Sequence, residues 1–227
     1  MKTNYYIEKT SKLIKGLDKY LVRLRKFMIP KYGETKTDTI LNRTKTYYPS
    51  IIEKMLFFKS SMYDELIVTS SRMLAVKKGL KDEDIQVEEF VSLMIEYLRV
   101  SRSKVPQVFG HLAGKVFLSK LMRYVLNIVA INVTANGWPT EIINGKKTDN
   151  FHMKVCTRNC QMVEFMRSVG EEDLIPYCSF ADFANAEFMG YSLKQETTID
   201  SGVCTFCFRK KGKVYWPENI QNLINKN

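Results

Sequence analysis

Residues 193–210 read Leu-Lys-Gln-Glu-Thr-Thr-Ile-Asp-Ser-Gly-Val-Cys-Thr-Phe-Cys-Phe-Arg-Lys. The Ser201-Gly202 pair indicates a turn, and the runs on either side of it, 193–199 and 203–210, are typical of short strands. This stretch places a small antiparallel sheet in the C-terminal half. The other elements that this half predicts are strands near 140–143 and 151–156 and helices near 160–169, 181–189 and 217–225.

The N-terminal half has helical periodicity instead. Apolar residues recur there at steps of three and four, namely Leu13, Leu17, Leu21, Leu24 and Met28. This pattern predicts an amphipathic helix that ends before Pro30. Residues 31–48 are rich in Thr, Lys and Tyr and predict a connecting loop. Pro49 suits the first turn of a second helix, which Gly79 is placed to end.

Two more helices are expected before residue 135. Asp82 or Asp84 caps the first, whose apolar residues are Val87, Phe90, Val91, Met94, Ile95 and Leu98. Pro106 opens the second, which runs through about Asn132. Its most apolar stretch, 121–135, contains Arg123 and is shorter than the roughly 20 apolar residues that a membrane span requires. We therefore expect a buried helix there.

These elements predict an α+β protein. An N-terminal helical region, residues 1–135, is expected to pack on a C-terminal mixed region, residues 136–227, which holds the small antiparallel sheet. A chain of 227 residues can bury a sizeable core, and a hydrophobic share of 45% argues against disorder. The two regions are expected to form one compact unit.

The net charge of +11 is concentrated near the N-terminus, where residues 1–54 hold thirteen Lys or Arg against five Asp or Glu. A basic face can attract nucleic acid, an anionic membrane or an acidic partner. These residues are mostly Lys along a helix, without a stacking platform, zinc finger or recognition helix. We therefore interpret them as a solvated helix face and do not expect a nucleic-acid partner.

The first residues lead directly into charged amphipathic sequence and lack the apolar segment of a secretory signal. We expect a cytoplasmic protein with a small-molecule substrate and no membrane partner. A homo-oligomer is compatible with the sequence.

All five cysteines lie in the mixed region: Cys156, Cys160, Cys178, Cys204 and Cys207. The spacings of the first two and the last two, with His152 nearby, could supply zinc ligands. However, Cys204 and Cys207 lie on a predicted strand, where residues three apart point to opposite faces. We predict no metal site and no cofactor, with zinc as the alternative, and interpret the cysteines as thiols, each of which could also be buried and inert.

Some of these residues could support chemistry. Cys160 is placed at the start of a helix, where backbone N–H groups favour a negative charge. Asp182 and Glu187 could act as general bases or serve as a helix cap and a surface charge. His152 has apolar neighbours, as a core histidine does. The sequence contains no phosphate-binding loop, dinucleotide fingerprint or nucleophile elbow.

The run from Asn136 to Arg209 resembles a known family. It contains Gly137-Trp138, then Cys160-Gln-Met-Val-Glu164-Phe165, Gly170, Leu174-Ile-Pro-Tyr177-Cys178, Asp182, Thr197-Thr198-Ile199, Gly202 and Cys204-Thr-Phe206-Cys-Phe208-Arg209. This pattern resembles the C-terminal half of the L-2-amino-thiazoline-4-carboxylic acid hydrolase family. Thr205 stands where that family has an acidic residue, and Cys178 is one residue further from Asp182.

The resemblance implies hydrolysis of a C–N bond in a small cyclic amidine-like compound, giving an N-carbamoyl amino acid. It also implies that Cys160, Cys178, Cys204, Glu164 and Asp182 are catalytic residues. Among these we expect Cys160 or Cys178 to supply the thiol and Asp182 to act as the base for water. Arg158 or Arg209 is expected to bind a substrate carboxylate.

Two alternatives remain open. The ending Gly-x-Cys-x-Phe-x-Phe also resembles small-molecule-sensing domains related to vinyl reductases, which need a pocket but no activated thiol. A basic nucleic-acid-associated protein would instead show affinity that falls steeply with salt.

Overall fold

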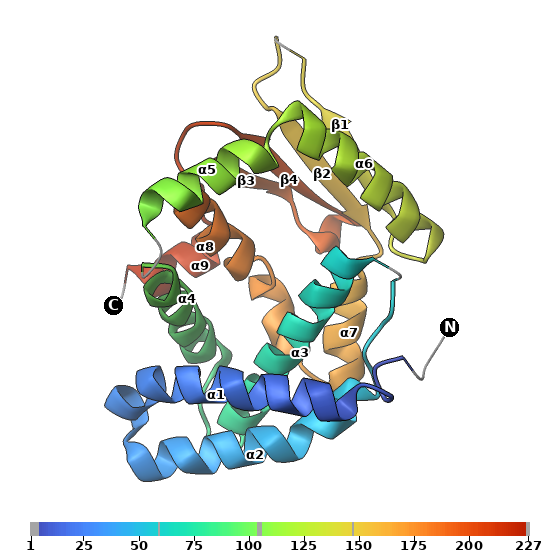
Figure 1. Ribbon diagram of the computed structural model, residues 1–227. Coiled ribbons are helices and arrows are strands. Elements are labelled where there is room, and N and C mark those ends of the chain that lie inside the picture. The colour runs from blue at the N-terminus through green and yellow to red at the C-terminus, as the bar shows by residue number, and fades with distance from the viewer. Residues whose placement is uncertain (1–4, 59, 104–105, 147, 226–227) are drawn as a thin grey trace. The chain divides into compact units, whose positions relative to one another are not determined.

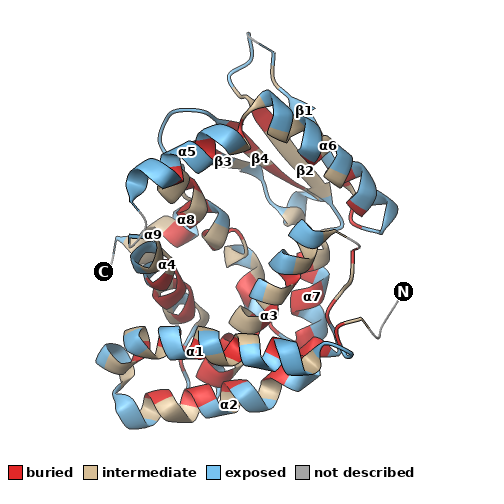
Figure 2. Ribbon diagram, viewed as in Figure 1, coloured by how far each residue is buried: buried red, intermediate tan, exposed pale blue. Residues whose placement is uncertain are grey.

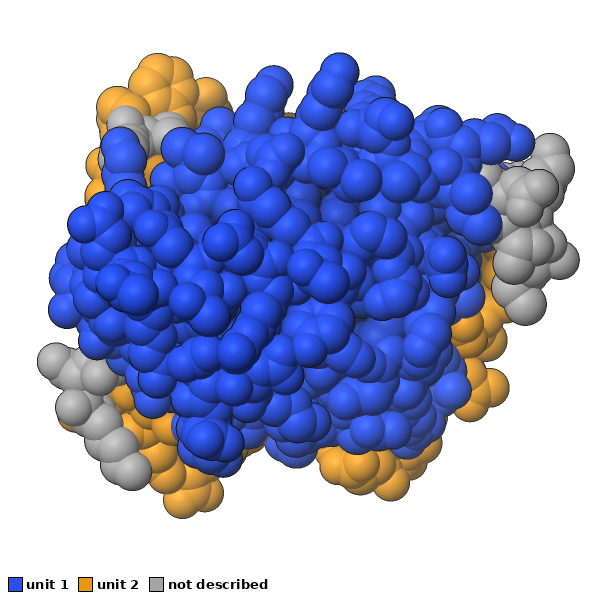
Figure 3. Space-filling model, turned by 90° about the horizontal axis from the view of Figure 1, so that it is seen from below, with its two compact units in different colours: residues 1–97, 162–176 blue, residues 98–161, 177–227 orange. Residues whose placement is uncertain are grey.

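The computed structural model describes residues 5–58, 60–103, 106–146 and 148–225. Helices dominate the N-terminal part, and a four-stranded antiparallel sheet follows in the C-terminal part, which confirms the α+β class (Figure 1). The chain forms two compact units (Figure 3). Unit 1 comprises Met1–Tyr97 and Met162–Pro176, and unit 2 comprises Leu98–Gln161 and Tyr177–Asn227. The units are thus divided at other places than residue 135, because a segment of the C-terminal half completes the helical unit.

Unit 1 is built from helices. They are α1 (Thr10–Tyr32), α2 (Glu34–Ile52), α3 (Ser61–Lys81), the first part of α4 (Val87–Ser103), α7 (Gln161–Val169) and the short 3-10 helix η1 (Glu172–Tyr177). The five apolar residues expected on the inner face of α1 are its buried residues. The expected end before Pro30 is wrong, since α1 continues to Tyr32 and Gly33, at φ 77°, then separates it from α2.

Helix α2 occupies the segment that the sequence predicted as a loop, so that prediction is wrong. Its buried face mixes apolar residues with Thr37, Thr44 and Tyr48. Thr44 satisfies its hydroxyl by donating to the Ile40 carbonyl oxygen at 2.8 Å. Because threonines occupy some of its buried positions, α2 lacks the regular apolar periodicity by which a helix is predicted from sequence. Pro49, expected in the first turn of a helix, lies in the last turn of α2.

Helix α3 does not end at Gly79 as expected but continues to Lys81. A Cβ atom at Gly79 would lie 2.7 Å from the Thr44 Oγ1 atom and 2.8 Å from the Ile40 carbonyl oxygen. The glycine therefore allows α2 and α3 to approach closely rather than ending a helix.

A buried ion pair joins the two sequence segments of unit 1. Lys77 and Glu171 are 2% and 1% exposed, and their charged atoms are 2.6 Å apart. The same Lys77 Nζ atom contacts Asp173. Buried charges need such partners, because an unpaired charge in a protein interior is strongly unfavourable.

Two further lysines bind the C-terminal end of α7. Lys54 donates to the Ser168 carbonyl oxygen at 2.5 Å, and Lys78 donates to the Val169 carbonyl oxygen at 2.7 Å. The last carbonyl groups of a helix have no partner within the helix and carry partial negative charge, so lysines stabilise this end.

Unit 2 is built around the sheet, whose strand order is β1-β2-β4-β3. Its elements are α5 (Gln107–Phe117), α6 (Lys120–Ala135), β1 (Thr140–Asn144), β2 (Met153–Arg158), α8 (Phe180–Met189), β3 (Ser192–Thr197), the 3-10 helix η2 (Ile199–Ser201), β4 (Val203–Arg209) and α9 (Glu218–Ile224). The four strands and the helices α7, α8 and α9 confirm the elements predicted for the C-terminal half.

The single long helix expected after Pro106 is two helices. The break falls at Leu118 and Ser119, and the Ser119 side chain accepts a hydrogen bond from the backbone N–H of Met122, which starts α6. Leu118 is buried there, in the core of unit 2. The expectation of a buried helix over residues 121–135 is also wrong, since Leu121 and Ile131 are 74% and 70% exposed (Figure 2).

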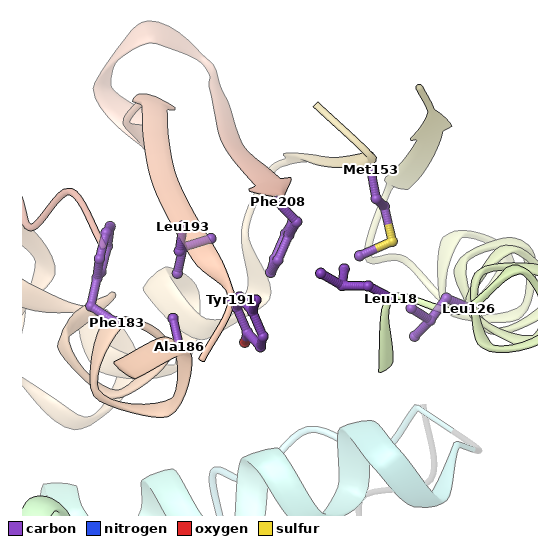
Figure 4. Packing of buried hydrophobic residues seen from close by; sticks show 8 residues of the cluster. All are labelled: Leu118, Leu126, Met153, Phe183, Ala186, Tyr191, Leu193 and Phe208. Carbon is purple, nitrogen blue, oxygen red and sulfur yellow. The ribbon is translucent and has the colours of Figure 1, made fainter. Parts of the chain in front are cut away.

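The core of unit 2 lies between one face of the sheet and helices α6 and α8 (Figure 4). Its buried members are Leu118, Leu126, Met153, Phe183, Ala186, Tyr191, Leu193 and Phe208. Aromatic rings of Phe117, Tyr191 and Phe208 contact one another with centroids 5.6–5.8 Å apart. This core holds the sheet face on which the candidate site lies.

Candidate active site

The position of Cys204 follows from the alternation of side chains along a strand. Phe208 belongs to the core on the helix-covered face, and Phe206 packs against that core. Cys204 lies on the same face, two and four residues before them, and pairs in register with Thr157 of β2. Cys207 lies on the opposite face, so the prediction that Cys204 and Cys207 point to opposite faces is confirmed.

Three thiols and one carboxyl group gather at this end of unit 2. Cys160 directly follows the turn after β2, Cys178 lies between η1 and α8, and Asp182 lies in the first turn of α8. Burial raises the pKa of Cys178, and the acidic groups of Cys160, Cys204 and Asp182 raise it further. Cys160 and Asp182 also act on the pKa of Cys204. These mutual effects place the four groups near one another.

A short hydrogen-bonded chain holds Cys204 in place. The Gln195 amide nitrogen of β3 lies 3.4 Å from the Cys204 Sγ atom, and the amide oxygen accepts from the Ser179 hydroxyl at 3.1 Å. Ser179 is the residue before α8 and is buried. The chain therefore connects β4 through β3 to the start of the helix that carries Asp182.

The surroundings set the protonation states of these groups. Burial raises the pKa of Cys204 to about 11, although the Gln195 hydrogen bond opposes this rise. Cys178 and Cys204 are therefore thiols, not thiolates, at neutral pH. Asp182 keeps an exposed surface, so water reaches this residue, but the protein around its carboxyl group raises its pKa to about 6. A carboxyl group with a pKa near neutrality is suited to general base chemistry.

An arginine that the sequence did not single out belongs to the same surroundings. Burial raises the pKa of Tyr191, Asp182 raises it further and Arg102 lowers it, so both charged groups lie near this phenol. The Arg102 Nη1 atom is buried and has no hydrogen-bond partner within the described ranges. An unsatisfied guanidinium nitrogen can bind a carboxylate.

No protein-family model, curated protein or solved structure matches this chain.

The arginines expected to bind substrate lie at opposite ends of the sheet. Arg158 is exposed and pairs in register with Val203, so it lies at the same end of the sheet as Cys204 but on the opposite face. Arg209 is five residues beyond Cys204 on β4, about 17 Å along the strand. It lies near His152, where burial and then Lys210, Arg123 and Arg209 lower the histidine pKa. The structure therefore places Arg158, but not Arg209, at the end of the sheet that carries Cys204.

Glu164 belongs to unit 1, on α7, and forms an exposed ion pair with Arg167 at 2.6 Å. Glu187 of unit 2 is engaged differently. Its carboxylate receives two hydrogen bonds from Arg99, both at 3.0 Å, and one from the Trp216 ring nitrogen at 2.7 Å. Glu187 thus fixes α8 to the C-terminal segment, which leaves Asp182 as the better placed base of the two.

The remaining cysteines lie on the other face of the sheet. The Thr205 hydroxyl lies 3.8 Å from the Cys156 Sγ atom, and burial and then Glu196 raise the pKa of Cys207 to about 11. Within the described part of the chain, no group of three or more His, Cys, Asp or Glu residues could hold a metal ion. The residues proposed for zinc are divided between the two faces and do not form one ligand set.

A shallow depression lies beside Gln195, the middle residue of the Ser179–Gln195–Cys204 hydrogen bonds. Its volume is about 490 Å³, and its lining includes Gln195 of β3 and Trp216. Gln195, Arg102 and Tyr191 are the contributors that sequence reasoning missed. Gln195 carried a usable signal, since it lies on the predicted strand 193–199, which the Ser201-Gly202 turn connects to the strand that carries Cys204. Nothing in the local sequence marks Arg102.

Proposed function

We propose that unit 2 hydrolyses a small cyclic amidine-like carboxylate, such as 2-amino-thiazoline-4-carboxylate, by adding water to its C=N carbon and opening the ring at the carbon–sulfur bond, which gives an N-carbamoyl amino acid. One observation carries this proposal. Asp182, with a pKa of about 6, lies near the three thiols of Cys160, Cys178 and Cys204. The resemblance of residues 136–209 to the amino-thiazoline hydrolase family independently favours these same residues.

Water is the nucleophile in the proposed reaction. Asp182 accepts a proton as the water oxygen adds to the C=N carbon, and the ring nitrogen takes up that proton. The hydroxyl group of the resulting tetrahedral intermediate then loses its proton to the Asp182 carboxylate as the ring carbon–sulfur bond breaks. The sulfur leaves with this proton as a thiol. The product is the substrate plus one water.

The cysteines have different roles in this scheme. Cys178 and Cys204 remain protonated because their pKa values are raised, so they supply weak S–H donors and an apolar wall. Cys160 directly precedes α7 and is the thiol best placed for a covalent route, since a helix N-terminus favours a negative charge.

The substrate carboxylate needs a cation. Arg102 offers a buried Nη1 atom with no hydrogen-bond partner in the described structure, and Asp182 and Arg102 both act on Tyr191. Arg158 has an exposed guanidinium at the same end of the sheet as Cys204, but its strand position is on the opposite face. We propose Arg102 as the primary clamp, because a carboxylate there would satisfy a buried donor.

The test is a mass-spectrometric turnover assay with 2-amino-thiazoline-4-carboxylate and related cyclic amidines. We expect a product one water heavier than the substrate, turnover lowered at least about 100-fold in Asp182→Asn, and a raised KM in Arg102→Gln. Cys207→Ser, on the other sheet face, is the matched control and keeps full turnover. Full turnover in Asp182→Asn would exclude it as the base.

A non-catalytic sensor is the second candidate. The raised pKa values of Cys178 and Cys204 favour it, because a sensor needs no activated thiol. Calorimetric binding of the same cyclic amidines without product formation, weakened by Arg102→Gln but not by Asp182→Asn, would support the sensor over the hydrolase.

A further inference from the structure

The outer faces of α5 and α6 expose an apolar surface. We call it the α5–α6 stripe, and its large exposed residues are Val108, Phe109, Leu112, Val116, Leu121, Tyr124, Val125, Ile128 and Ile131. Their exposed fractions range from 41% to 74%. Solvent-exposed apolar residues scattered singly are normal on proteins, but a contiguous run of this kind marks an interaction surface.

Helix geometry gathers the stripe on one side of each helix. Val108, Leu112 and Val116 follow one another at steps of four on α5, and Leu121, Val125 and Ile128 follow at steps of four and three on α6. Pale blue runs along both α5 and α6 in Figure 2, so much of the surface of these helices is exposed.

The opposite sides of both helices are already used within unit 2. On α5, Gly110 and Gly114 lie against the end of α8, where a Cβ atom would come within 2.4 Å of the Phe188 carbonyl oxygen and 2.2 Å of the Met189 carbonyl oxygen. On α6, Leu126, Ala130 and Val133 are buried. The helices are therefore apolar on two sides, and the core needs only one of them.

The charged residues of α5 and α6 have a single sign. The sequence from Tyr97 to Thr140 contains no Asp or Glu. Lys115 and Lys120 are exposed, and each lies one helical turn from a stripe residue, Leu112 and Tyr124 respectively. The stripe is thus flanked by lysines where α5 meets α6, whereas Glu141 of β1 lines a depression together with Ile131 near the other end of α6.

This charge distribution selects among the partners that could cover the stripe. In a symmetric dimer that pairs the α5–α6 breaks of two copies, the lysines of the copies would approach one another without an acidic partner from either helix. An anionic lipid surface satisfies both features, since headgroups attract the lysines and the acyl region accepts the apolar side chains. Tyr124 has the apolar ring and polar tip typical of this boundary.

The helices fit the plane of a membrane surface better than a span. Within the described ranges, no single helix is long and apolar enough to cross a membrane, and α5 with α6 meets the length and composition criteria only as a pair bent by 63°. Arg123 points inward and donates to the His152 carbonyl oxygen at 2.9 Å. Contacts of this kind keep the inner sides of the helices in the protein.

We propose that the α5–α6 stripe docks unit 2 on the surface of a membrane that contains anionic lipids. Both helices lie in the interfacial plane, with the stripe in the headgroup and upper acyl region and Lys115 and Lys120 at the headgroups. This inference differs from the sequence-based expectation of no membrane partner, and it does not depend on the hydrolase activity.

The test is sedimentation of the full chain with vesicles of phosphatidylcholine alone and with added phosphatidylserine. We expect binding to the anionic vesicles and little to the neutral ones. The Leu121→Ser/Ile131→Ser variant should bind at least about tenfold more weakly, because it loses exposed apolar area. Lys115→Gln/Lys120→Gln should also lose about tenfold, and the remaining salt dependence should be smaller.

Val22→Ser/Met62→Ser is the matched control, since both residues are exposed apolar side chains of unit 1. It should bind as the unchanged chain does, and circular dichroism should show the same helix content in all variants. Absent binding to anionic vesicles, or binding unaffected by Leu121→Ser/Ile131→Ser, overturns the proposal. A dimer that this variant abolishes, without vesicle binding, assigns the stripe to a second copy and overturns it as well.

Discussion

At the scale of single residues, Asp182 combines two properties that oppose each other. It is ionised less readily than an ordinary aspartate because the surrounding protein disfavours its charge. The same effect places its pKa of about 6 in the range in which a carboxylate can accept and release protons at neutral pH. Its ionisation therefore has a cost in stability, and it is the step that the proposed hydrolysis requires.

The sign of this cost can be tested. The folded-state pKa of about 6 is above the ordinary value of 3.8, so the protonated carboxyl group stabilises the fold. That stability is fully present below about pH 4 and is lost as the pH rises through about 6. We expect Asp182→Asn to remove this loss, so that the variant gains stability over the unchanged chain at pH 8 but not at pH 4.

The measurement is chemical denaturation of both proteins at several pH values. Asp200→Asn, which removes an exposed carboxylate of η2, is the control and should leave the pH dependence unchanged. Equal stability differences at pH 4 and pH 8 would contradict the raised pKa. For an active hydrolase, turnover should rise with pH through about 6, in the range where the stability falls.

At the scale of elements, the sequence predicted the C-terminal half well. All four strands and the three helices that follow β2 were predictable, because Gly-containing turns separate short runs of clear character. Helix α2 was not, since its inner face carries Thr37 and Thr44, whose hydroxyl groups lower the apolar contrast. The break between α5 and α6 was not predictable either. Ser119 caps α6, but it lies within a continuous apolar run that reads as one helix.

The candidate site was only partly predictable. Cys160, Cys178, Cys204 and Asp182 could be chosen from the sequence because their side chains have distinctive chemistry. Their proximity required the register of β2 with β4, which sequence does not determine. Arg102 could not be found, because its unsatisfied Nη1 atom results from tertiary burial and not from any local pattern.

Gly79 supplies a prediction at this scale. Alanine favours helices by about 1 kcal/mol over glycine, but a Cβ atom at Gly79 would lie 2.7 Å from Thr44 Oγ1 and 2.8 Å from a backbone oxygen. We expect Gly79→Ala to destabilise unit 1 by about 1–3 kcal/mol, as overpacking does. Thermal and denaturant unfolding measure this change.

Gly16→Ala is the matched control for Gly79→Ala. Its new Cβ atom would lie 2.6 Å from the Nη2 atom at the end of the Arg72 side chain, which can move aside. We expect this variant to be neutral or to gain up to about 1 kcal/mol from helix propensity. A stabilising Gly79→Ala would show that the α2–α3 contact adjusts without cost.

At the scale of the whole molecule, the two units are interleaved in sequence. Unit 1 takes in Met162–Pro176, and unit 2 takes in the chain on either side of that segment. The buried Lys77–Glu171 ion pair connects the two sequence segments of unit 1. It therefore links residues that are far apart in the sequence.

We expect Lys77→Met to destabilise the chain by about 3–5 kcal/mol, because it removes the cation 2.6 Å from the buried Glu171 carboxylate and leaves only the more distant Lys78, at 3.9 Å, among the described ion pairs. The double variant Lys77→Met/Glu171→Leu should recover most of this loss, since it buries apolar groups instead of a charge. Lys81→Met, at an exposed position of the same helix, is the control. A loss below about 1 kcal/mol in denaturant unfolding of Lys77→Met would show that the pair is not a major contact.

The interleaving also determines the order in which the protein can form during synthesis. When β2 leaves the ribosome, its neighbour β4 is still untranslated, and the helical unit lacks the acidic partner of Lys77 until residue 171 emerges. Both units are therefore incompletely folded over much of translation. The edge of β2 is unpaired, and Lys77 has not yet met Glu171. Nascent chains of this protein are accordingly the form most exposed to chaperones and proteases.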